Sequence, residues 1–316
     1  MLDVRRLRLL KEFAGRGSIA ATAAALGYTS SAVSQQLAAL EREAGATLLD
    51  RTPRSAELTD AGRRLAAYAE RILAMVEEAE ADLSAQANEP SGRVIVTAFP
   101  TAAVAFAPAL ARSLRAHPGL TLLLRQTQRG EGVSQVRSGE VDVALVDDWT
   151  GRLPRQSRGM LRFYPLVRDP LVLVIPWGHP AADPAEPIDL NRLRQEPWMA
   201  APEGEPSRQV VDRLLAAAGG APPVPWEFEG LGTILSLVAR GIGIAAIPRL
   251  TLAAGEGRVV VRELPGSDLA RDVYAVVRAA SVRRPSIGAI LTALHAAAKT
   301  LPGQLAIGGP ATRPAG

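Results

Sequence analysis

Residues 60–87 carry one continuous helical pattern, rich in Ala and Glu, between two zones of different composition. Its apolar side chains alternate four and three positions apart, the a/d spacing of a coiled coil over about three heptads. The seam consists of Leu65, Ala69, Ile72, Val76, Ala79 and Leu83. Acidic residues flank it, as expected for a solvated outer face. Because the helix stands between two zones, we expect it to pair with the same helix of a second copy rather than to pack on its own domain.

Composition excludes several classes of function. A chain of 316 residues is about twice the usual domain size, so two or three domains are expected. The absence of cysteine removes disulfides, thiol catalysis and thiolate metal sites. The three histidines are far apart, Lys11 and Lys299 are the only lysines, and no G-K-[ST] sequence occurs. We therefore expect no metal, no cofactor and no enzyme activity.

The beginning of the chain is not expected to act as an export signal. Asp3, Arg5 and Arg6 stand where a signal peptide would have its apolar core, and no run of 18 apolar residues occurs anywhere. We therefore expect no membrane span and a cytoplasmic location.

Residues 2–64 contain short helical segments separated by turn residues. Ser18 is a candidate N-cap for a second helix that stops at Gly27, and Thr29 caps a third helix. Two Ala-rich helices around a tight glycine turn are typical of a helix-turn-helix. Off its apolar face, the third helix carries groups that can bond base edges or phosphates: Ser30, Ser31, Ser34, Gln35 and Gln36.

Two short extended runs around Pro53 predict a β-wing after that helix. Arg51 and Arg54 on this wing can reach phosphates or a minor groove. The candidate DNA-binding residues are Ser18, Ser30, Ser31, Ser34, Gln35, Arg51, Thr52 and Arg54. The alternative for the same pattern is a small three-helix interaction domain with a solvated polar face.

These motifs resemble the winged-helix domain of the LysR-type transcriptional regulators. The resemblance rests on residues 18–26, on Ser31-Ala32-Val33-Ser34-Gln35-Gln36-Leu37, on Arg51-Thr52, and on Leu58-Thr59-Asp60-Ala61-Gly62. It extends over nearly all of residues 2–300. The family often has Pro, Arg and Phe where this chain has Ser31, Gln35 and Leu49. These departures affect the usual base contacts, and hence the operator sequence, but not the expected fold.

Residues 93–300 alternate short β-branched runs with helical patterns, which is an α/β signature. A strand over 93–99 is followed at once by Pro100 and Thr101 at a helix start, which places backbone N–H groups and a hydroxyl at the carboxyl end of the sheet. This is a suitable place for an anion such as a carboxylate. The βαβαβ order that follows demands a parallel sheet. A second α/β unit begins near Pro170 with the strand 171–176.

The resemblance implies that these two units form a periplasmic-binding-protein-like effector domain, with a small ligand in the cleft between two lobes. Carried over residue by residue, it suggests that the ring around the cleft is formed by Pro100, Thr101, Gln128, Asp147, Ser207 and Leu231. The alternative for each is a cap or loop residue without a ligand.

We therefore expect an α+β multidomain chain of four segments. They are a winged helix-turn-helix DNA-binding domain (1–60), a linker or dimerisation helix (61–89), an effector-binding domain (90–301) and a disordered Pro/Gly-rich tail (302–316). Lobe I of the effector domain is expected over about 90–168 and 270–301, and lobe II over about 169–269.

The sequence thus predicts a double-stranded-DNA-binding transcriptional regulator whose activity responds to a small-molecule effector. Its expected partners are a DNA operator, an effector such as a carboxylate, and a second copy of the chain. The resemblance adds homotetramers and, as a candidate partner, RNA polymerase. The second hypothesis is a cytoplasmic solute-binding or enzymatic α/β protein with an N-terminal oligomerisation module. Deletion of residues 1–60 separates the two, because DNA binding is lost only under the first.

Overall fold

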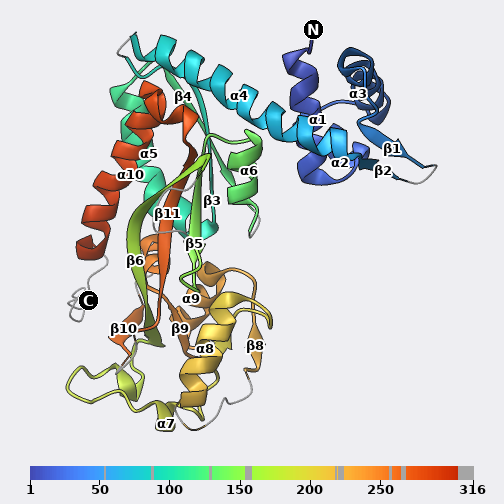
Figure 1. Cartoon of the computed structure of the whole chain (residues 1–316). Coiled ribbons are helices and arrows are strands. Elements are labelled where there is room, and N and C mark those ends of the chain that lie inside the picture. Colours follow the sequence, from blue (N-terminus) through green and yellow to red (C-terminus); the bar gives the residue numbers. More distant parts are fainter. Residues whose placement is uncertain are drawn as a thin grey trace.

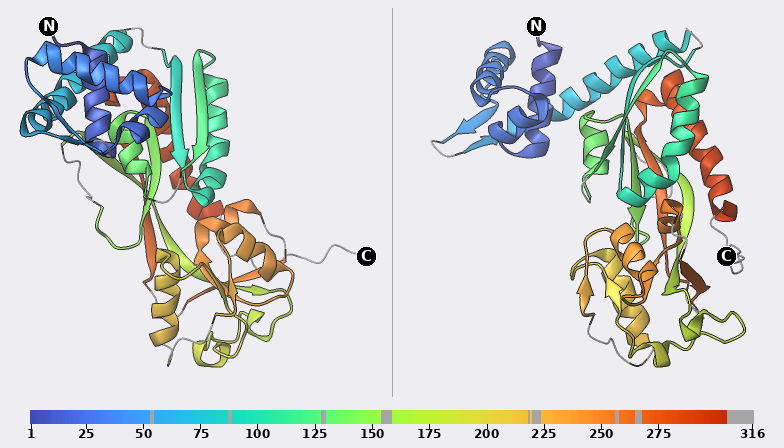
Figure 2. Two further views of the ribbon diagram at one scale, coloured as in Figure 1. Left: turned by 90° about the vertical axis from the view of Figure 1, so that its right-hand side faces the viewer. Right: turned by 180° about the vertical axis from the view of Figure 1, so that it is seen from behind.

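The computed structural model describes residues 1–52, 55–86, 89–127, 130–153, 159–217, 219, 224–255, 258–264 and 268–304. Within these ranges the chain forms a small N-terminal domain, one long helix and a two-lobed α/β body (Figure 1). The N-terminal domain lies beside one lobe, and the other lobe forms the far end of the molecule in both further views (Figure 2). The predicted α+β multidomain architecture is confirmed. None of the helices in the described ranges is long and apolar enough to cross a membrane.

The N-terminal domain is a three-helix unit with a hairpin. Its elements are α1 (Val4–Arg16), α2 (Ile19–Leu26), α3 (Ser30–Ala44), β1 (Leu49–Arg51) and β2 (Ala56–Leu58). The side chains of Asp3, Ser18 and Thr29 cap the three helices by accepting first-turn N–H groups. A glycine in the left-handed region ends each helix. The inward faces share one core that includes Leu7, Leu10, Phe13, Val33, Leu37, Leu40 and Leu48.

Helix α4 (Asp60–Gln86) connects this domain to lobe I. In its first half, Ala66 and Ala69 are buried in the core of the N-terminal domain. In its second half, Glu77 accepts hydrogen bonds from Arg278 (2.8 and 2.9 Å), and Asp82 accepts one from Arg283 (2.9 Å). Two of the acidic residues expected on a solvated face therefore hold the helix to lobe I.

The exposed apolar stripe of α4 differs from the predicted seam. Ala69 is fully buried within the protomer, and Leu65 packs partly on the same core. The first turns of the helix complete the N-terminal domain, so these two side chains pack within their own protomer. The exposed apolar side chains that share one face of the helix are Tyr68, Ile72, Met75, Val76, Ala79 and Leu83.

Lobe I is built on a parallel sheet extended by antiparallel strands. Strand β3 (Gly92–Ala98) lies between β4 (Leu120–Gln126) and β5 (Val143–Asp148) and is parallel to both, as the βαβαβ order predicted. Strand β11 (Ala270–Arg278) pairs antiparallel with β5 and with β6 (Leu161–Pro176).

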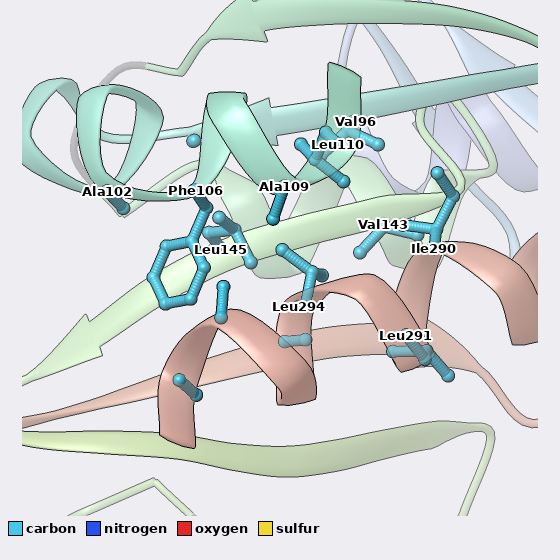
Figure 3. Packing of buried hydrophobic residues seen from close by; sticks show 14 of the residues in the cluster. Val96, Ala102, Phe106, Ala109, Leu110, Val143, Leu145, Ile290, Leu291 and Leu294 are labelled. Atoms are coloured by element: carbon cyan, nitrogen blue, oxygen red, sulfur yellow. The ribbon is translucent and has the colours of Figure 1, made fainter. Parts of the chain in front are cut away.

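Helices cover both faces of this sheet. On one face, α5 (Pro100–Ala116) and α10 (Pro285–Gln304) pack side by side, with Phe106 and Leu110 facing Ile290 and Leu294 (Figure 3). On the other face, α6 (Gly132–Ser138) packs Val136 against the strands. The 3-10 helix η3 (Ala280–Arg283) precedes α10 and contacts α4.

Lobe II grows from the far half of β6. Its other elements are η1 (Pro180–Ala182), α7 (Leu190–Leu193), β7 (Met199–Ala200), α8 (Pro206–Ala217), β8 (Trp226–Glu227), α9 (Leu231–Ala239), β9 (Ala245–Pro248), η2 (Arg249–Ala254) and β10 (Val259–Glu263). Strands β9 and β10 both pair antiparallel with β6. Strand β6 thus belongs to both lobes and runs from one to the other (Figure 1).

Two predicted boundaries are wrong. Strand β6 begins ten residues before the expected strand 171–176, because prolines and charged residues hide the extended character of its first half, whose backbone pairs with β11. Helix α10 continues through Gln304, so residues 302–304 are helical rather than part of a disordered tail. Residues 305–316 lie outside the described residues.

Gly62 supports a test of the packing between α4 and the hairpin. A Cβ at Gly62 would stand 2.1 Å from the carbonyl oxygen of Leu48, whereas Gly15 in α1 has open space around it. We predict that Gly62→Ala destabilises the chain by about 1–3 kcal/mol through overpacking. The matched control Gly15→Ala should leave stability unchanged or raise it slightly. Urea denaturation followed by circular dichroism measures both, and equal midpoints for wild type and Gly62→Ala would contradict the packing.

Candidate DNA interface and effector cleft

Helix α3 presents a polar face to solvent. Val33, Leu37 and Leu40 are buried on its inner side, since they follow the helical period. Ser30, Ser31 and Gln35 are exposed on its outer side. An exposed helix face of hydroxyl and amide groups fits the major groove of DNA, where such groups bond to base edges.

The wing is held against α3 by two side chains. Arg51 at the end of β1 donates from Nη1 to Ser34 Oγ (2.8 Å) and pairs through Nη2 with Glu41 (3.4 Å). Glu41 also accepts the backbone N–H groups of Leu48 (2.9 Å) and Leu49 (3.0 Å). Helix and wing therefore form one surface, with the guanidinium of Arg51 beside the polar face of α3.

The remaining predicted DNA contacts have different surroundings. Ser18 caps α2 by accepting the N–H of Ala21 (3.1 Å). Thr52 accepts from the N–H of Ser55 (3.0 Å), which closes the turn of the hairpin. Arg54 lies outside the described residues. Ser18 and Thr52 thus have structural partners in the free protein and remain predicted DNA contacts.

Arg271 of β11 lies at the centre of a polar cluster where the two lobes join. Its Nε donates to Asp169 Oδ2 (2.9 Å), Nη1 donates to Asp147 Oδ2 (3.1 Å) and Nη2 donates to Thr101 Oγ1 (2.8 Å). These partners come from β6, from the end of β5 and from the start of α5. One guanidinium therefore ties together four segments where the two lobes join.

Two aromatic rings enclose this guanidinium. Its Cζ lies 4.7 Å from the ring centroid of Phe99 and 5.5 Å from that of Trp149, which are cation–π distances. The indole Nε1 of Trp149 also donates to Asp147 Oδ2 (3.0 Å). Arg271 is thereby almost completely removed from solvent.

The acidic residues near Arg271 differ in environment. Burial raises the pKa of Asp169, although Arg271 and the N–H of Leu250 stabilise its charged form. Burial also acts to raise the pKa of Asp148, but hydrogen bonds from Leu153 and Thr150 outweigh it and lower that pKa below its ordinary value. Asp148 therefore shapes the turn after β5, and Asp147 beside it faces Arg271.

The structure brings two of the predicted effector residues together, because Thr101 and Asp147 share Arg271. Pro100 precedes Thr101 in the first turn of α5, which has no side-chain cap. Ser207 and Leu231 are half-buried at the starts of α8 and α9 in lobe II.

Gln128 lies outside the described residues. Its neighbour Thr127 donates a hydrogen bond to Gln135 of α6 (3.1 Å). Across the described residues, no group of His, Asp or Glu suited to a metal ion occurs.

Sequence reasoning missed Arg271 and Asp169. A signal was present: Val273, Ala275 and Val277 alternate into the core, and Arg271 continues that alternation by one step. Asp169 stands likewise two residues before the buried Leu171. A charged residue at an inward position requires a buried partner, but their separation of 102 residues hides which partner it is.

Two family descriptions match the chain, one over the N-terminal domain and one over the two-lobed body. "Bacterial regulatory helix-turn-helix protein, lysR family" matches residues 4–63, and "LysR substrate binding domain" matches residues 87–299. The chain belongs to the LysR family. It is a transcriptional regulator with a helix-turn-helix DNA-binding domain and an effector-binding domain.

HTH-type transcriptional regulators of other bacteria resemble the chain over most of its length. An uncharacterized HTH-type transcriptional regulator of Mycobacterium tuberculosis is 32% identical over 87% of this chain and 89% of its own. The HTH-type transcriptional regulator CbbR of Xanthobacter flavus is 32% identical over 86% of this chain and 81% of its own.

Solved structures share the fold of this LysR-family chain. A full-length OxyR variant from Pseudomonas aeruginosa has a TM-score of 0.66 at 21% identity, covering 93% of this chain and 98% of that one. Full-length CbnR complexed with its target DNA has a TM-score of 0.52 at 22% identity, covering 94% and 100%. At these identities the likeness concerns the fold alone.

Gln35 provides a test of the DNA interface of this LysR-family regulator. We predict that Gln35→Ala costs about 1–3 kcal/mol of discrimination between operator and scrambled DNA, because a bidentate amide contact to a base is lost. Binding to scrambled DNA should change little, since it depends on phosphate contacts. Fluorescence anisotropy titrations at fixed salt measure both. Gln209→Ala, which removes an exposed amide in lobe II, is the control, and equal discrimination by the two variants would count against the interface.

Proposed function

We propose that this LysR-family regulator binds a double-stranded operator through α3 and the wing, and that a small effector between the lobes modulates this binding. The observation that carries the proposal is the continuous polar surface formed by the outer face of α3 and Arg51. Side chains such as Ser31 and Gln35 would contact base edges, and Arg51 would contact the phosphate backbone. The predicted contacts Ser18, Ser30, Ser34, Thr52 and Arg54 complete the same interface.

We further propose a homodimer that pairs through α4. Five large apolar side chains of this helix are exposed. Met75 and Leu83 have the largest exposed fractions, 70% and 68%. A continuous apolar stripe on a charged helix is costly in water and suits a two-fold contact with a second copy. Such a dimer presents two copies of α3 to two half-sites of an operator. Pairs of dimers would form a homotetramer on longer operators.

The connections of β11 support a route from the cleft to the DNA-binding domain. Arg278, on the same strand as Arg271, donates to the carbonyl oxygens of Val136 (2.9 Å) and Val141 (2.6 Å) around the end of α6. Lys11 of α1 donates to the carbonyl oxygens of Arg137 (2.9 Å) and Ser138 (3.3 Å) at the end of α6. A displacement of β11 or α6 on effector binding would therefore be transmitted to α1 through Lys11 and to α4 through Glu77.

The curated relatives above are named as transcriptional regulators. We accordingly propose that the cleft binds an effector rather than converting a substrate. Thr101 and Asp147, with Pro100, Gln128, Ser207 and Leu231, are the proposed lining. The protein would act on chromosomal DNA in the cytoplasm, with RNA polymerase as the proposed recipient of the signal.

The decisive test of this function is sequence-specific DNA binding. We predict that the full chain prefers DNA from upstream of its own gene or a neighbouring gene over scrambled DNA by at least about 10³-fold at physiological salt, as specific regulators do. Electrophoretic mobility shift with competitor DNA measures the ratio. Deletion of residues 1–60 should abolish binding to both DNAs. A full chain that shows no preference for any upstream fragment would falsify the proposal.

Met75 provides a test of the proposed dimer. We predict that Met75→Glu shifts the chain from dimer to monomer at micromolar concentration, because it places a charge in an apolar contact. Size-exclusion chromatography with light scattering gives the mass. Ile242→Glu places the same charge on an exposed apolar position of lobe II and should remain dimeric. Equal masses for the two variants would count against pairing through α4.

A further inference from the structure

We propose that Asp147 is a built-in carboxylate that occupies, on Arg271, the place of the effector's anionic group, and that a carboxylate effector binds by displacing it. This inference rests on the proposed function, in which a small molecule enters the cleft between the lobes. It adds the chemical class of the ligand, the residue that binds it and the residue with which it competes.

The two carboxylates on Arg271 are held unequally. The side chain of Asp169 is 2% exposed, and Asp169 also accepts the backbone N–H of Leu250 (2.8 Å), so it is fixed from two sides. The side chain of Asp147 is 28% exposed, and its second partner is the indole N–H of Trp149. Asp147 is therefore the partner that can leave Arg271 without leaving a fully buried charge unpaired.

The charges of the cluster permit the exchange of Asp147 for an external carboxylate. One guanidinium faces two carboxylates, so Asp169 alone neutralises Arg271 and Asp147 adds a surplus negative charge within the same buried site. Two carboxylates that share one cation repel each other. When Asp147 swings toward solvent and an external carboxylate takes its place, the charge of the buried site is unchanged and Asp147 regains its hydration.

The hydrogen-bond donors that become free when Asp147 moves away match a planar carboxylate. Nη1 and Nη2 of Arg271 form the edge of a guanidinium fork, which binds carboxylates through two parallel hydrogen bonds. The hydroxyl of Thr101 already accepts from Nη2, so its own proton is available to an incoming oxygen. The indole N–H of Trp149 is released with Asp147. The vacated position therefore offers four donors to one anion.

The alternative role for Asp147 is that of a direct ligand-binding group, with Arg271 only orienting it. The two roles predict effects of opposite sign. Removing the charge of Asp147 strengthens the binding of a carboxylate if Asp147 is a competitor, because the fraction of protein with a free Arg271 rises. If Asp147 is the receptor, it accepts hydrogen bonds from a hydroxyl or ammonium group of the ligand, and removing its charge weakens the binding of that ligand.

The experiment uses the full-length protein and sodium acetate as the probe, with sodium chloride at equal ionic strength as the reference. Thermal shift and tryptophan fluorescence report the apparent Kd for acetate. We expect Asp147→Asn to bind acetate about tenfold more tightly than wild type, in proportion to the larger free fraction of Arg271. Trp149→Phe, which removes the second hold on Asp147, should shift in the same direction and serves if Asp147→Asn folds poorly.

Two further variants test whether acetate binding depends on the guanidinium of Arg271. Arg271→Lys keeps the charge but loses the fork, so acetate binding should weaken at least tenfold in that variant. Asp268→Asn removes a carboxylate that is almost fully exposed and pairs with Arg168 (2.8 Å), and it should match wild type.

The proposal is overturned if Asp147→Asn binds acetate no more tightly than wild type. It is also overturned if neither Asp147→Asn nor Trp149→Phe shows a thermal shift that is specific to acetate. The same preparations are titrated with upstream DNA. Specific DNA binding without an acetate effect rejects this inference alone. Acetate binding without DNA preference rejects the proposed function alone.

Discussion

The burial of two arginines on β11 is the constraint on which the arrangement of the chain depends. Arg278 is almost fully buried and donates to Glu77 of α4, to Asp142 and to two carbonyl oxygens beside α6. A buried guanidinium requires a partner for its donors, and loss of one partner costs about 3–5 kcal/mol. This side chain therefore helps to hold the linker helix and α6 in one relative position on lobe I.

Arg271 and Arg278 face different surroundings, since an odd separation along a strand places side chains on opposite faces of the sheet. Arg271 contacts Thr101 on the α5 face, and Arg278 contacts α6 and α4 on the other. Strand β11 thus joins the candidate effector site to the helix that leads to the DNA-binding domain. Packed secondary-structure elements of this kind can carry coupling between two distant sites.

Much of the N-terminal domain could be predicted from the sequence. Ser18, Thr29 and Gly27 mark helix ends by contacts within three or four residues, and the burial of Val33 and Leu37 follows from the helical period. The outer face of α3 follows from the same period. For the effector domain, the order of strands and helices predicted a parallel sheet and placed Thr101 at its carboxyl edge, where the structure has it.

The sequence by itself therefore determined the winged helix, the long linker helix and the α/β order, because caps, turns and periodicity act between near neighbours. Only the tertiary structure decided that Arg271 meets Asp169, Asp147 and Thr101, which stand 102, 124 and 170 residues away. It also decided that Ala69 is buried in the protomer while Tyr68 and Met75 are exposed. Such pairings depend on sheet register and on domain packing, which arise only when all the segments are in place.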